Sequence, residues 1–588
     1  MDASLVAPWS AGACEILQLN LRRLPVLANI SKIQRLWNAL TSGVVVVSVL
    51  AAVPALAQDS RSRDQDRFFW PGNLVVSRSV YDSNPNNVQV GEILPPNCAS
   101  TQGGCSAATG APFNGTYPFV WNNDTYDGSF GITSKIYLDQ ILPFGLLIDS
   151  LEVPNSSQRG ITPSSDQLVT SFSSKSELAL HLSTNGQYLT FGGYVAPINQ
   201  LDVSNSNTPG AVDSTNPVGE NVYRAVAQVD RRGRFQFTET NAYSGNNGRA
   251  VILNNSNGGS FFYTTGNAGN GSNPQPDGVI LGAGAQIISP ANEPESAQVP
   301  SIPTPVGSFS VTELGAKADK IGKDDNFRGI TIFNNVLYYS KGSGSNGVNT
   351  VYFLDTTGSA CPSGVGLPSS SAKLPTSPLS YNIADLQTKG LPENMCILAG
   401  FPSVPNKTAT TVSFPFGIWF ANATTLYVAD EGDGYAGGTD LYTHAAAQTT
   451  AGLQKWVFNS STSMWSLAYT LHTGLDLGVP YTVRHYPSGT NAATGLPWAP
   501  ATDGLRNIMG IAGDDGFVAI WAITSTVSGN GDQGADPNKL VVVFDSVQNT
   551  DPTLASKETF FPIREAGFGE VLRGVSLTPG TEFASSDR

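Results

Sequence analysis

One motif returns along the chain and limits its fold more than any other feature. It consists of a short apolar strand, a tight turn rich in Asn, Asp and Gly, and a second strand that ends in a Gly-rich loop. Copies lie at 247–271, 326–347, 415–434 and 504–534, with a diverged copy at 176–193. Turns of this composition accept the positive φ angles that β-hairpins need. The motif therefore predicts a series of antiparallel hairpins.

Further strands extend the hairpin into a unit of four. After the copy at 415–434, the segments GLQKWVF (452–458) and WSLAYTL (465–471) flank a polar turn and supply the third and fourth strands. Four antiparallel strands make the blade of a β-propeller. We expect the innermost strands of five blades to start at Glu177, Arg249, Arg328, Phe416 and Arg506.

The two ends of the chain are expected to share a sixth blade. Residues 571–579 supply an innermost strand with almost no chain after it, while 73–81 supply a second strand with no first; 134–141 and 144–153 would finish the blade. Closure of this kind removes free sheet edges. The sequence predicts an all-β, six-bladed propeller closed by strands from both termini. A seventh blade, or two separate β-sandwich or barrel domains, are the alternatives.

The first 57 residues resemble an export leader. Basic residues precede an apolar run at 44–57 that ends in Ala-Leu-Ala, and this run is shorter than the roughly 20 apolar residues that cross a bilayer. We therefore expect an exported protein, periplasmic or extracellular, with no transmembrane segment after leader removal. Residues 58–588 would form one propeller domain with insertions at about 82–133, 355–393 and 473–503.

The cysteine count agrees with export. Cys14 lies in the leader, which leaves an even set of four. Of the three ways to pair them, we expect the local disulfides Cys98–Cys105 and Cys361–Cys396. A structural zinc site is the alternative, although the sequence has no Cys-x-x-Cys pair.

Charge and motifs exclude several classes of function. The formal net charge is −14, from 32 basic and 46 acidic residues, so we expect no nucleic-acid partner. The chain has no G-x-S-x-G, no H-E-x-x-H and no phosphate-binding G-x-x-x-x-G-K-[ST]. We expect a monomer that takes a small-molecule or saccharide-like ligand.

One face of the ring is expected to gather the charged residues. In a four-stranded blade, the loops that lead into the innermost strand and those that leave the second strand share a face. The former place around the channel mouth Asn246, Asn247, Asp325, Asn326, Asp503 and Glu570, beside Arg249, Arg328, Arg506 and Arg573. The latter add an outer circle of Asp430, Glu431, Asp433, Asp532 and Asp536.

This oxygen-rich set is typical of a hard cation, because Ca²⁺ takes six to eight oxygen ligands. The predicted metal ligands are Asn246, Asn326 and the outer circle, and the four arginines are the predicted ligand-binding residues. Asp325, Asp503 and Glu570 are candidate proton-transfer groups, and His485, between Arg484 and Tyr486, is a candidate general base. Alternatively, the repeated acid–arginine pattern is an ion-pair ring that closes the propeller.

The segments 415–434, 452–458, 465–471, DGLRNIMG (503–510), NGDQGADPN (530–538) and EVLRGVSLTP (570–579) carry a family resemblance. They resemble a functionally uncharacterised family of secreted bacterial propeller proteins. In architecture the chain is similar to six-bladed propellers of the gluconolactonase, paraoxonase and strictosidine-synthase-like class, which implies a central calcium or a channel-mouth site. The arginines beside the acidic positions depart from that pattern, because a nearby cation lowers affinity for Ca²⁺.

Two functions remain open at this point. The first is an exported propeller that binds a divalent cation and a small or oligomeric ligand at its acidic face, and acts as a calcium-dependent hydrolase or lactonase if it is an enzyme. The second is a non-catalytic extracellular or cell-surface interaction module.

Overall fold

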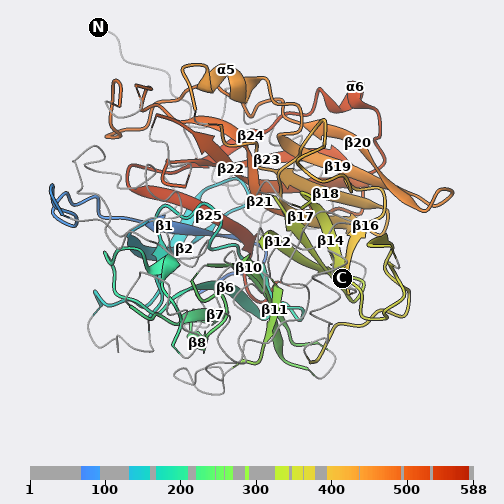
Figure 1. Cartoon of the computed structure of the whole chain (residues 1–588), viewed down its shortest axis with the longest axis horizontal. Coiled ribbons are helices and arrows are strands. Elements are labelled where there is room, and N and C mark those ends of the chain that lie inside the picture. The colour runs from blue at the N-terminus through green and yellow to red at the C-terminus, as the bar shows by residue number, and fades with distance from the viewer. Residues whose placement is uncertain are drawn as a thin grey trace, which may run out of the picture.

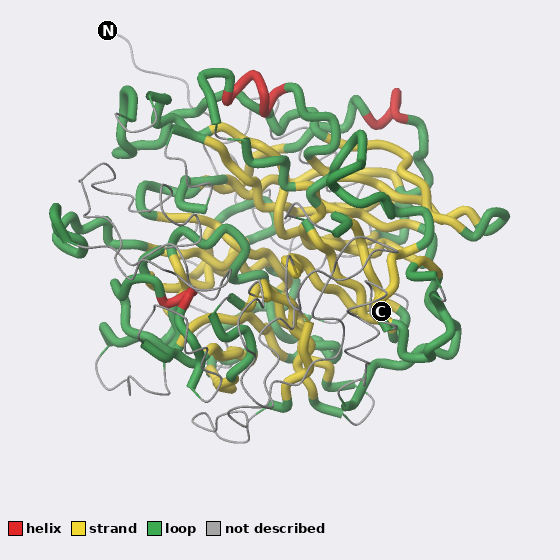
Figure 2. Tube along the Cα trace, in the orientation of Figure 1, coloured by secondary structure: helices red, strands yellow, loops and turns green. Residues whose placement is uncertain are grey.

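The structure is a computed structural model of the whole chain, and nearly all of its regular structure is β (Figures 1 and 2). It describes residues 68–92, 131–158, 167–209, 220–245, 247–256, 259–268, 285–290, 325–342, 347–361, 363–377, 394–435, 437–491, 495–529 and 534–581. Of residues 267, 268, 325 and 326 only the backbone is described. The predicted leader and the Cys98–Cys105 pair lie outside the described residues.

Six small sheets form a six-bladed β-propeller, as the sequence predicts. Blade 1 contains β25 (Glu570–Leu577), β1 (Leu74–Val80), β2 (Thr133–Ile141) and β3 (Leu147–Glu152), with β4 (Thr170–Ser171) paired to β2. Blade 2 contains β5 (His181–Leu182), β6 (Tyr188–Tyr194), β7 (Arg224–Asp230) and β8 (Phe235–Thr240). Blade 3 contains β9 (Gly248–Asn254), β10 (Phe261–Ala268) and β11 (Ala285–Ile288).

The other three blades follow in chain order. Blade 4 contains β12 (Asp325–Phe333), β13 (Val336–Lys341), β14 (Thr350–Leu354) and β16 (Met395–Leu398), with β15 (Val365–Gly366) paired to β16. Blade 5 contains β17 (Pro415–Asn422), β18 (Thr425–Asp430), β19 (Gly452–Asn459) and β20 (Met464–Leu471). Blade 6 contains β21 (Ala501–Ala512), β22 (Phe517–Val527), β23 (Lys539–Ser546) and β24 (Phe561–Glu565). A short pairing of β10 with β12 joins blades 3 and 4.

Helix in the described residues is confined to short pieces. They are η1 (Val203–Asn205), α5 (Leu441–Ala446) and α6 (Pro552–Ala555). In the described part of the chain, no helix is long and apolar enough to cross a membrane.

The ring closes between the two ends of the chain, which confirms the shared blade. β25 pairs antiparallel with β1, from Leu74 opposite Leu577 to Val80 opposite Glu570. Figure 1 shows the red last strand beside the blue first strand. β1 then pairs with β2 and β2 with β3. Because closure uses main-chain hydrogen bonds between the ends, neither end leaves an innermost edge strand unpaired.

Equivalent positions of the innermost strands pack against one another around the ring. We call the first ring the six residues Leu178, Arg249, Arg328, Phe416, Arg506 and Arg573. The residue after a first-ring position touches the next blade: a Cβ on Gly417 would lie 2.7 Å from the backbone oxygen of Arg506. In blade 6, Asn507 takes this place and donates its amide to the backbone oxygen of Arg573 at 2.7 Å.

Serines on the second strands add hydrogen bonds between blades. The backbone N–H of Gly574 donates to Ser77 Oγ at 2.8 Å, and Ser77 Oγ donates to the backbone oxygen of Leu178 at 2.7 Å. Ser340 donates in the same way from blade 4 to the backbone oxygen of Phe416 at 2.5 Å. Apolar side chains fill the remaining space between neighbouring blades, for example where Leu74 and Val76 of blade 1 pack in one cluster with Trp521 and Ile523 of blade 6.

Candidate functional site

Four predicted arginines lie near the starts of innermost strands and are buried. Arg249 is on β9, Arg328 on β12, Arg506 on β21 and Arg573 on β25, with exposed fractions between 2% and 5%. Three of them belong to a compact group that we call the arginine cluster, which consists of Lys175, Glu177, Arg249, Arg328, Glu431 and Arg506.

Glu431 is the acidic centre of the arginine cluster. It directly follows β18, and its carboxylate lies 3.4 Å from Arg328 Nη2, 3.2 Å from Arg506 Nε and 4.0 Å from Lys175 Nζ. Burial raises the pKa of Glu431, but Lys175, Arg328, Arg506 and Arg249 together lower it to about 2. Glu431 is therefore ionised at neutral pH and joins blades 4, 5 and 6.

Asn247 links a second carboxylate to Arg249. Asn247 Nδ2 donates to Glu177 Oε1 at 3.3 Å, and Arg249 Nε donates to Asn247 Oδ1 at 3.3 Å. Glu177 also accepts from Thr170 Oγ1 at 2.6 Å and from the Tyr194 hydroxyl at 2.5 Å. Its oxygens are thus already engaged by protein donors.

The predicted pairing of Arg573 with Glu570, the acid three residues before it, differs from what the structure contains. Glu570 lies 2.5 Å from Arg78 Nη1 on β1, while Arg573 donates to the backbone oxygens of Phe172 and, at 2.8 Å, Gly534. Glu570 and Arg573 therefore contact different partners, although they are only three positions apart. An ion-pair group does connect blades, but Glu431 from the outer circle supplies its acid.

The other predicted acids are engaged separately by their own loops. Asp430 accepts from the backbone N–H of Phe414 at 2.9 Å and of Gly432 at 3.0 Å, and burial raises its pKa to about 6. Asp503 accepts from the backbone N–H of Gly434 at 2.9 Å and from Gln448 Nε2, and burial raises its pKa to about 7.

Two further members of the outer circle lie apart from the arginine cluster. Asp536 is buried and accepts from the Tyr486 hydroxyl at 2.5 Å and Ser528 Oγ at 3.0 Å. Asp433 is exposed, and its carboxylate lies 2.7 Å from His444 Nε2. Asn246 and Asp532 lie outside the described residues, and Asp325 and Asn326 are placed by backbone only at the start of β12.

A cavity of about 780 Å³ occupies the channel beyond the arginine cluster. All six innermost strands line it, each through the residue three positions after its first-ring residue. We call these residues the second ring: His181, Ile252, Thr331, Trp419, Met509 and Ser576. At about 3.3 Å per residue the two rings are separated by roughly 10 Å along the strands.

The cavity carries no charge in its described lining, which contains no Asp, Glu, Lys or Arg. Trp419, Phe420 and Trp465 contribute aromatic surface, and Trp419 stacks on Tyr427 with ring centroids 5.8 Å apart. The cavity wall also includes residues 367–370, from the insertion that follows β14. Its lining thus combines apolar and aromatic side chains with neutral polar ones.

His181 is the titratable member of the second ring. Burial lowers the pKa of His181 to about 4, although hydrogen bonds to the backbone at Ile330 and Val251 act to raise it. The imidazole is therefore neutral at physiological pH. Its Nδ1 is buried and has no hydrogen-bond partner within the described residues.

Comparisons with known proteins add little beyond the fold. No protein-family model matches the chain, and no curated protein sequence matches it. Among solved structures, a putative 6-phosphogluconolactonase from Bacteroides uniformis ATCC 8492 is 8% identical, with 86% of this chain and 99% of that chain covered and a TM-score of 0.31. The NanB sialidase from Streptococcus pneumoniae is 11% identical over 78% of this chain and 48% of that chain, with a TM-score of 0.11. Likenesses this distant assign no activity.

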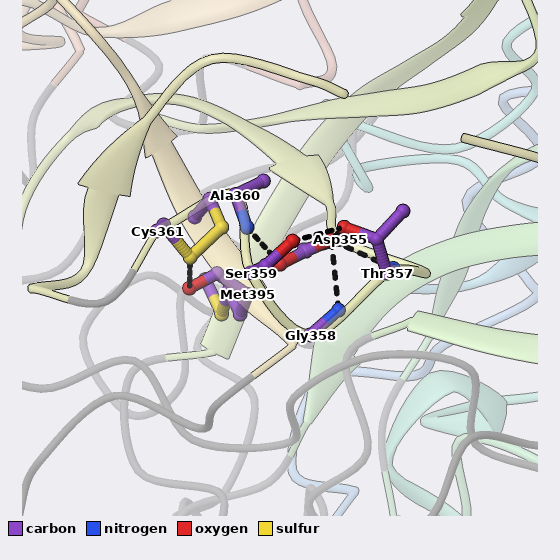
Figure 3. The surroundings of a disulfide bond; sticks show 8 residues. Asp355, Thr357, Gly358, Ser359, Ala360, Cys361 and Met395 are labelled. Atoms are coloured by element: carbon purple, nitrogen blue, oxygen red, sulfur yellow. Dashed lines mark hydrogen bonds between the residues drawn. A yellow bond between two sulfur atoms is a disulfide. The ribbon is translucent and has the colours of Figure 1, made fainter. Parts of the chain in front are cut away.

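The disulfide Cys361–Cys396 is present as predicted and begins the insertion that reaches the cavity wall. In the part of the chain that the structure describes, Asp355, Cys361 and Cys396 form the one grouping of potential metal-ligand atoms. Both thiols are consumed by the disulfide, and the Asp355 carboxylate accepts from the backbone N–H groups of Thr357 and Ala360, each at 2.8 Å (Figure 3). This grouping is therefore a turn stabilised by hydrogen bonds and a disulfide. Because the two cysteines are bonded to each other, they offer no free thiolate to a zinc ion.

The described carboxylates do not fit Ca²⁺ in the arginine cluster. Four cationic side chains act on Glu431, and the oxygens of Asp430 and Asp503 already accept from backbone and glutamine N–H groups. A calcium ion would have to displace these donors and tolerate the cations. Calcium binding stays a prediction from sequence.

Two histidines lie outside the arginine cluster. His485 is exposed, in a left-handed backbone conformation with φ 65°. His444, which the sequence did not single out, pairs with Asp433 and stacks on Tyr435 with centroids 4.2 Å apart. Its hydrogen bond to Asp433 raises the pKa of His444. No sequence spacing pointed to this pair, because the chain folds back between Asp433 and His444 to form it.

Proposed function

We propose that this protein is an exported, non-catalytic binding module whose channel cavity takes an uncharged, saccharide-like ligand. One observation carries the proposal: a cavity of about 780 Å³, formed by all six blades, has no charged residue in its described lining. Ligand pockets are of this size and are mostly apolar, with a few placed polar groups.

The second ring supplies the chemistry that such a ligand needs. The Trp419 ring offers a flat apolar face for the C–H face of a sugar or a similar flat group. Thr331 and Ser576 offer hydroxyl groups that can hydrogen-bond to the hydroxyl groups of such a ligand. A charged ligand would lose its hydration here without a described counter-charge, so the cavity favours neutral molecules.

Export is supported by the disulfide and by the predicted leader. The Cys361–Cys396 bond joins residues on either side of the insertion that contributes to the cavity wall. Disulfides of this kind persist in oxidising compartments. Reduction would release the insertion and is expected to weaken ligand binding.

A thermal-shift and calorimetric screen of neutral mono- and oligosaccharides tests the proposal. We expect saturable binding by the mature, disulfide-bonded protein and at least tenfold weaker binding by Trp419→Ala. Trp70→Ala is the matched control, because Trp70 is 46% exposed and outside the cavity. Binding that survives Trp419→Ala would contradict the proposal.

The competing proposal is calcium-assisted hydrolysis at the acidic face. Elemental analysis, together with melting measured with and without a chelator, distinguishes this hydrolase from the binding module. The described carboxylates are occupied by protein donors, which favours the binding module. Stoichiometric calcium whose removal lowers the melting temperature, together with loss of turnover in Asp503→Asn, would favour the hydrolase.

A further inference from the structure

The cavity reaches from the channel to the outermost strand of blade 5. Trp419 lies on β17, the innermost strand of that blade, and Trp465 lies on β20, the outermost, and both residues line the cavity. The sheet order is β17, β18, β19, β20, so three strand spacings, or about 14 Å, separate these two strands. The lining thus continues beyond the second ring, across the width of a blade.

The lining beyond the second ring includes an apolar part where blades 4 and 5 meet. We call this part the apolar arm, and it consists of Phe333, Leu367, Leu374, Phe420, Phe458 and Trp465. The Phe333 ring stacks on that of Phe420, with ring centroids 4.5 Å apart. The Trp465 ring lies 6.0 Å from that of Phe420 and 5.5 Å from that of Phe458. The four rings therefore form one continuous aromatic surface.

The insertion that follows β14 adds two aliphatic side chains to the apolar arm. Leu367 and Leu374 are partly buried and pack against the same hydrophobic cluster as the aromatic rings. Backbone hydrogen bonds fix this region, because the N–H of Ala399 donates to the oxygen of Gly366 at 2.8 Å. The N–H of Trp465 in turn donates to the oxygen of Ala399 at 2.9 Å. The insertion, blade 4 and blade 5 are thus held together at the apolar arm.

Blades 2 and 3 bring neutral polar side chains to another part of the cavity. Ser183 and Thr184 come from the turn between β5 and β6, and Asn254 comes from the end of β9. Thr184 Oγ1 donates to Asn254 Oδ1 at 3.2 Å, which joins the two blades at this point. The cavity therefore offers polar groups on one side and the apolar arm on another, an arrangement that matches a ligand with both characters.

We propose that the cavity ligand is a neutral glycoside with an apolar aglycone, whose sugar lies at the second ring and whose aglycone lies in the apolar arm. This inference rests on the proposed function, which places a sugar against Trp419. A free sugar would leave the apolar arm without an apolar partner, whereas an alkyl or aryl aglycone would bury apolar surface there. The described lining has no charged side chain to pair with a charged aglycone.

Calorimetric titration with methyl, butyl and octyl glycosides of glucose, galactose and mannose, below the concentrations at which they form micelles, tests the inference. For a sugar that binds, we expect saturable binding and an affinity at least tenfold higher for the octyl than for the methyl glycoside. Leu374→Gln should reduce this ratio at least threefold. Leu467→Gln is the matched control and should keep the wild-type ratio, because Leu467 is 45% exposed on β20 and lies outside the cavity.

Two results would overturn the inference. One is equal affinity of the wild type for the methyl and octyl glycosides; this measurement needs no variant, so it decides the question if Leu374→Gln does not fold. The other is a folded Leu374→Gln protein with the wild-type ratio. In either case, binding of methyl glycosides that depends on Trp419 would still support the proposed function, whereas no binding of any saccharide or glycoside would reject both proposals.

Discussion

The same six strands build two unlike ends of one channel. At the first ring, four of six positions are arginine, and Glu431 joins two of them through ion pairs. Three residues further along, the second ring has no Asp, Glu, Lys or Arg, and its histidine is neutral. The charged side chains gather at the first ring, where Glu431 joins the blades. The cavity lies at the second ring, whose residues carry no charge.

This difference suggests that the first ring holds the blades together and that the second ring binds the ligand. Buried ion pairs need well-placed partners, so a group such as the arginine cluster fixes the relative positions of blades. An uncharged cavity places no such demand on its walls and leaves room for a ligand. Substitutions at the first ring should therefore act on stability, and substitutions at the second ring on ligand affinity.

Glu431→Gln is expected to have the largest effect on stability. Arg328, Arg506 and Lys175 would lose their shared carboxylate inside the protein, at a cost of about 3 to 5 kcal/mol. Urea unfolding followed by circular dichroism measures this. Asp433→Asn is the control, since Asp433 is exposed and its loss should cost under about 1 kcal/mol. Equal effects of the two substitutions would mean that the cluster does not hold the blades together.

Acid should destabilise the wild type through the same residue. The pKa of Glu431 falls from 4.5 to about 2 on folding, which corresponds to about 3 kcal/mol. This stability is fully present above pH 4.5 and is lost as the pH falls through about 2. The unfolding free energy of Glu431→Gln should lack this decline, so parallel pH profiles for the two proteins would contradict the assignment.

Asp503 is expected to give the opposite pH dependence. Burial raises its pKa from 3.8 to about 7, so the folded state favours the protonated acid. Its contribution is present at low pH and is lost as the pH rises from about 4 through 7. Asp503→Asn, which keeps an acceptor oxygen for Gly434, should gain stability relative to the wild type as the pH rises to 8. A constant difference between the proteins across this range would show that Asp503 is not perturbed.

Gly510→Ala should mainly affect the second ring. A Cβ at Gly510 would lie 2.5 Å from Trp419 Cδ2, so the indole must move, at a cost of about 1 to 3 kcal/mol. Calorimetry should show weaker saccharide binding. Gly192→Ala is the matched control, because its Cβ would be 3.7 Å from Val251, an ordinary contact. Unaltered affinity in Gly510→Ala would remove Trp419 from the binding surface.

The architecture, and the positions of some residues of the arginine cluster, could be predicted from the sequence. Repeated hairpins predicted the blades, and the half-blades at 73–81 and 571–579 predicted ring closure. Arg328 and Arg506 lie on innermost strands, where the repeats place them. Their partner was missed because Glu431 reaches them from another blade, and the angle between blades is set by tertiary packing.

The cavity could not be predicted because no residue type encodes empty volume. Alignment of the repeats on the first ring does place His181, Thr331 and Trp419 at one equivalent position, three residues later. That pattern identifies the wall but not the space between the walls. The pair of His444 with Asp433 likewise depends on a loop that folds back on itself.

The most direct test is a crystal structure of the mature protein with a neutral oligosaccharide identified by the screen. We predict that the sugar lies in the channel cavity against Trp419 and within hydrogen-bond distance of Thr331 or Ser576, while Glu431 keeps its contacts with Arg328 and Arg506. A sugar bound instead at Asp503 and Asp433, with a calcium ion among their carboxylates, would contradict the account.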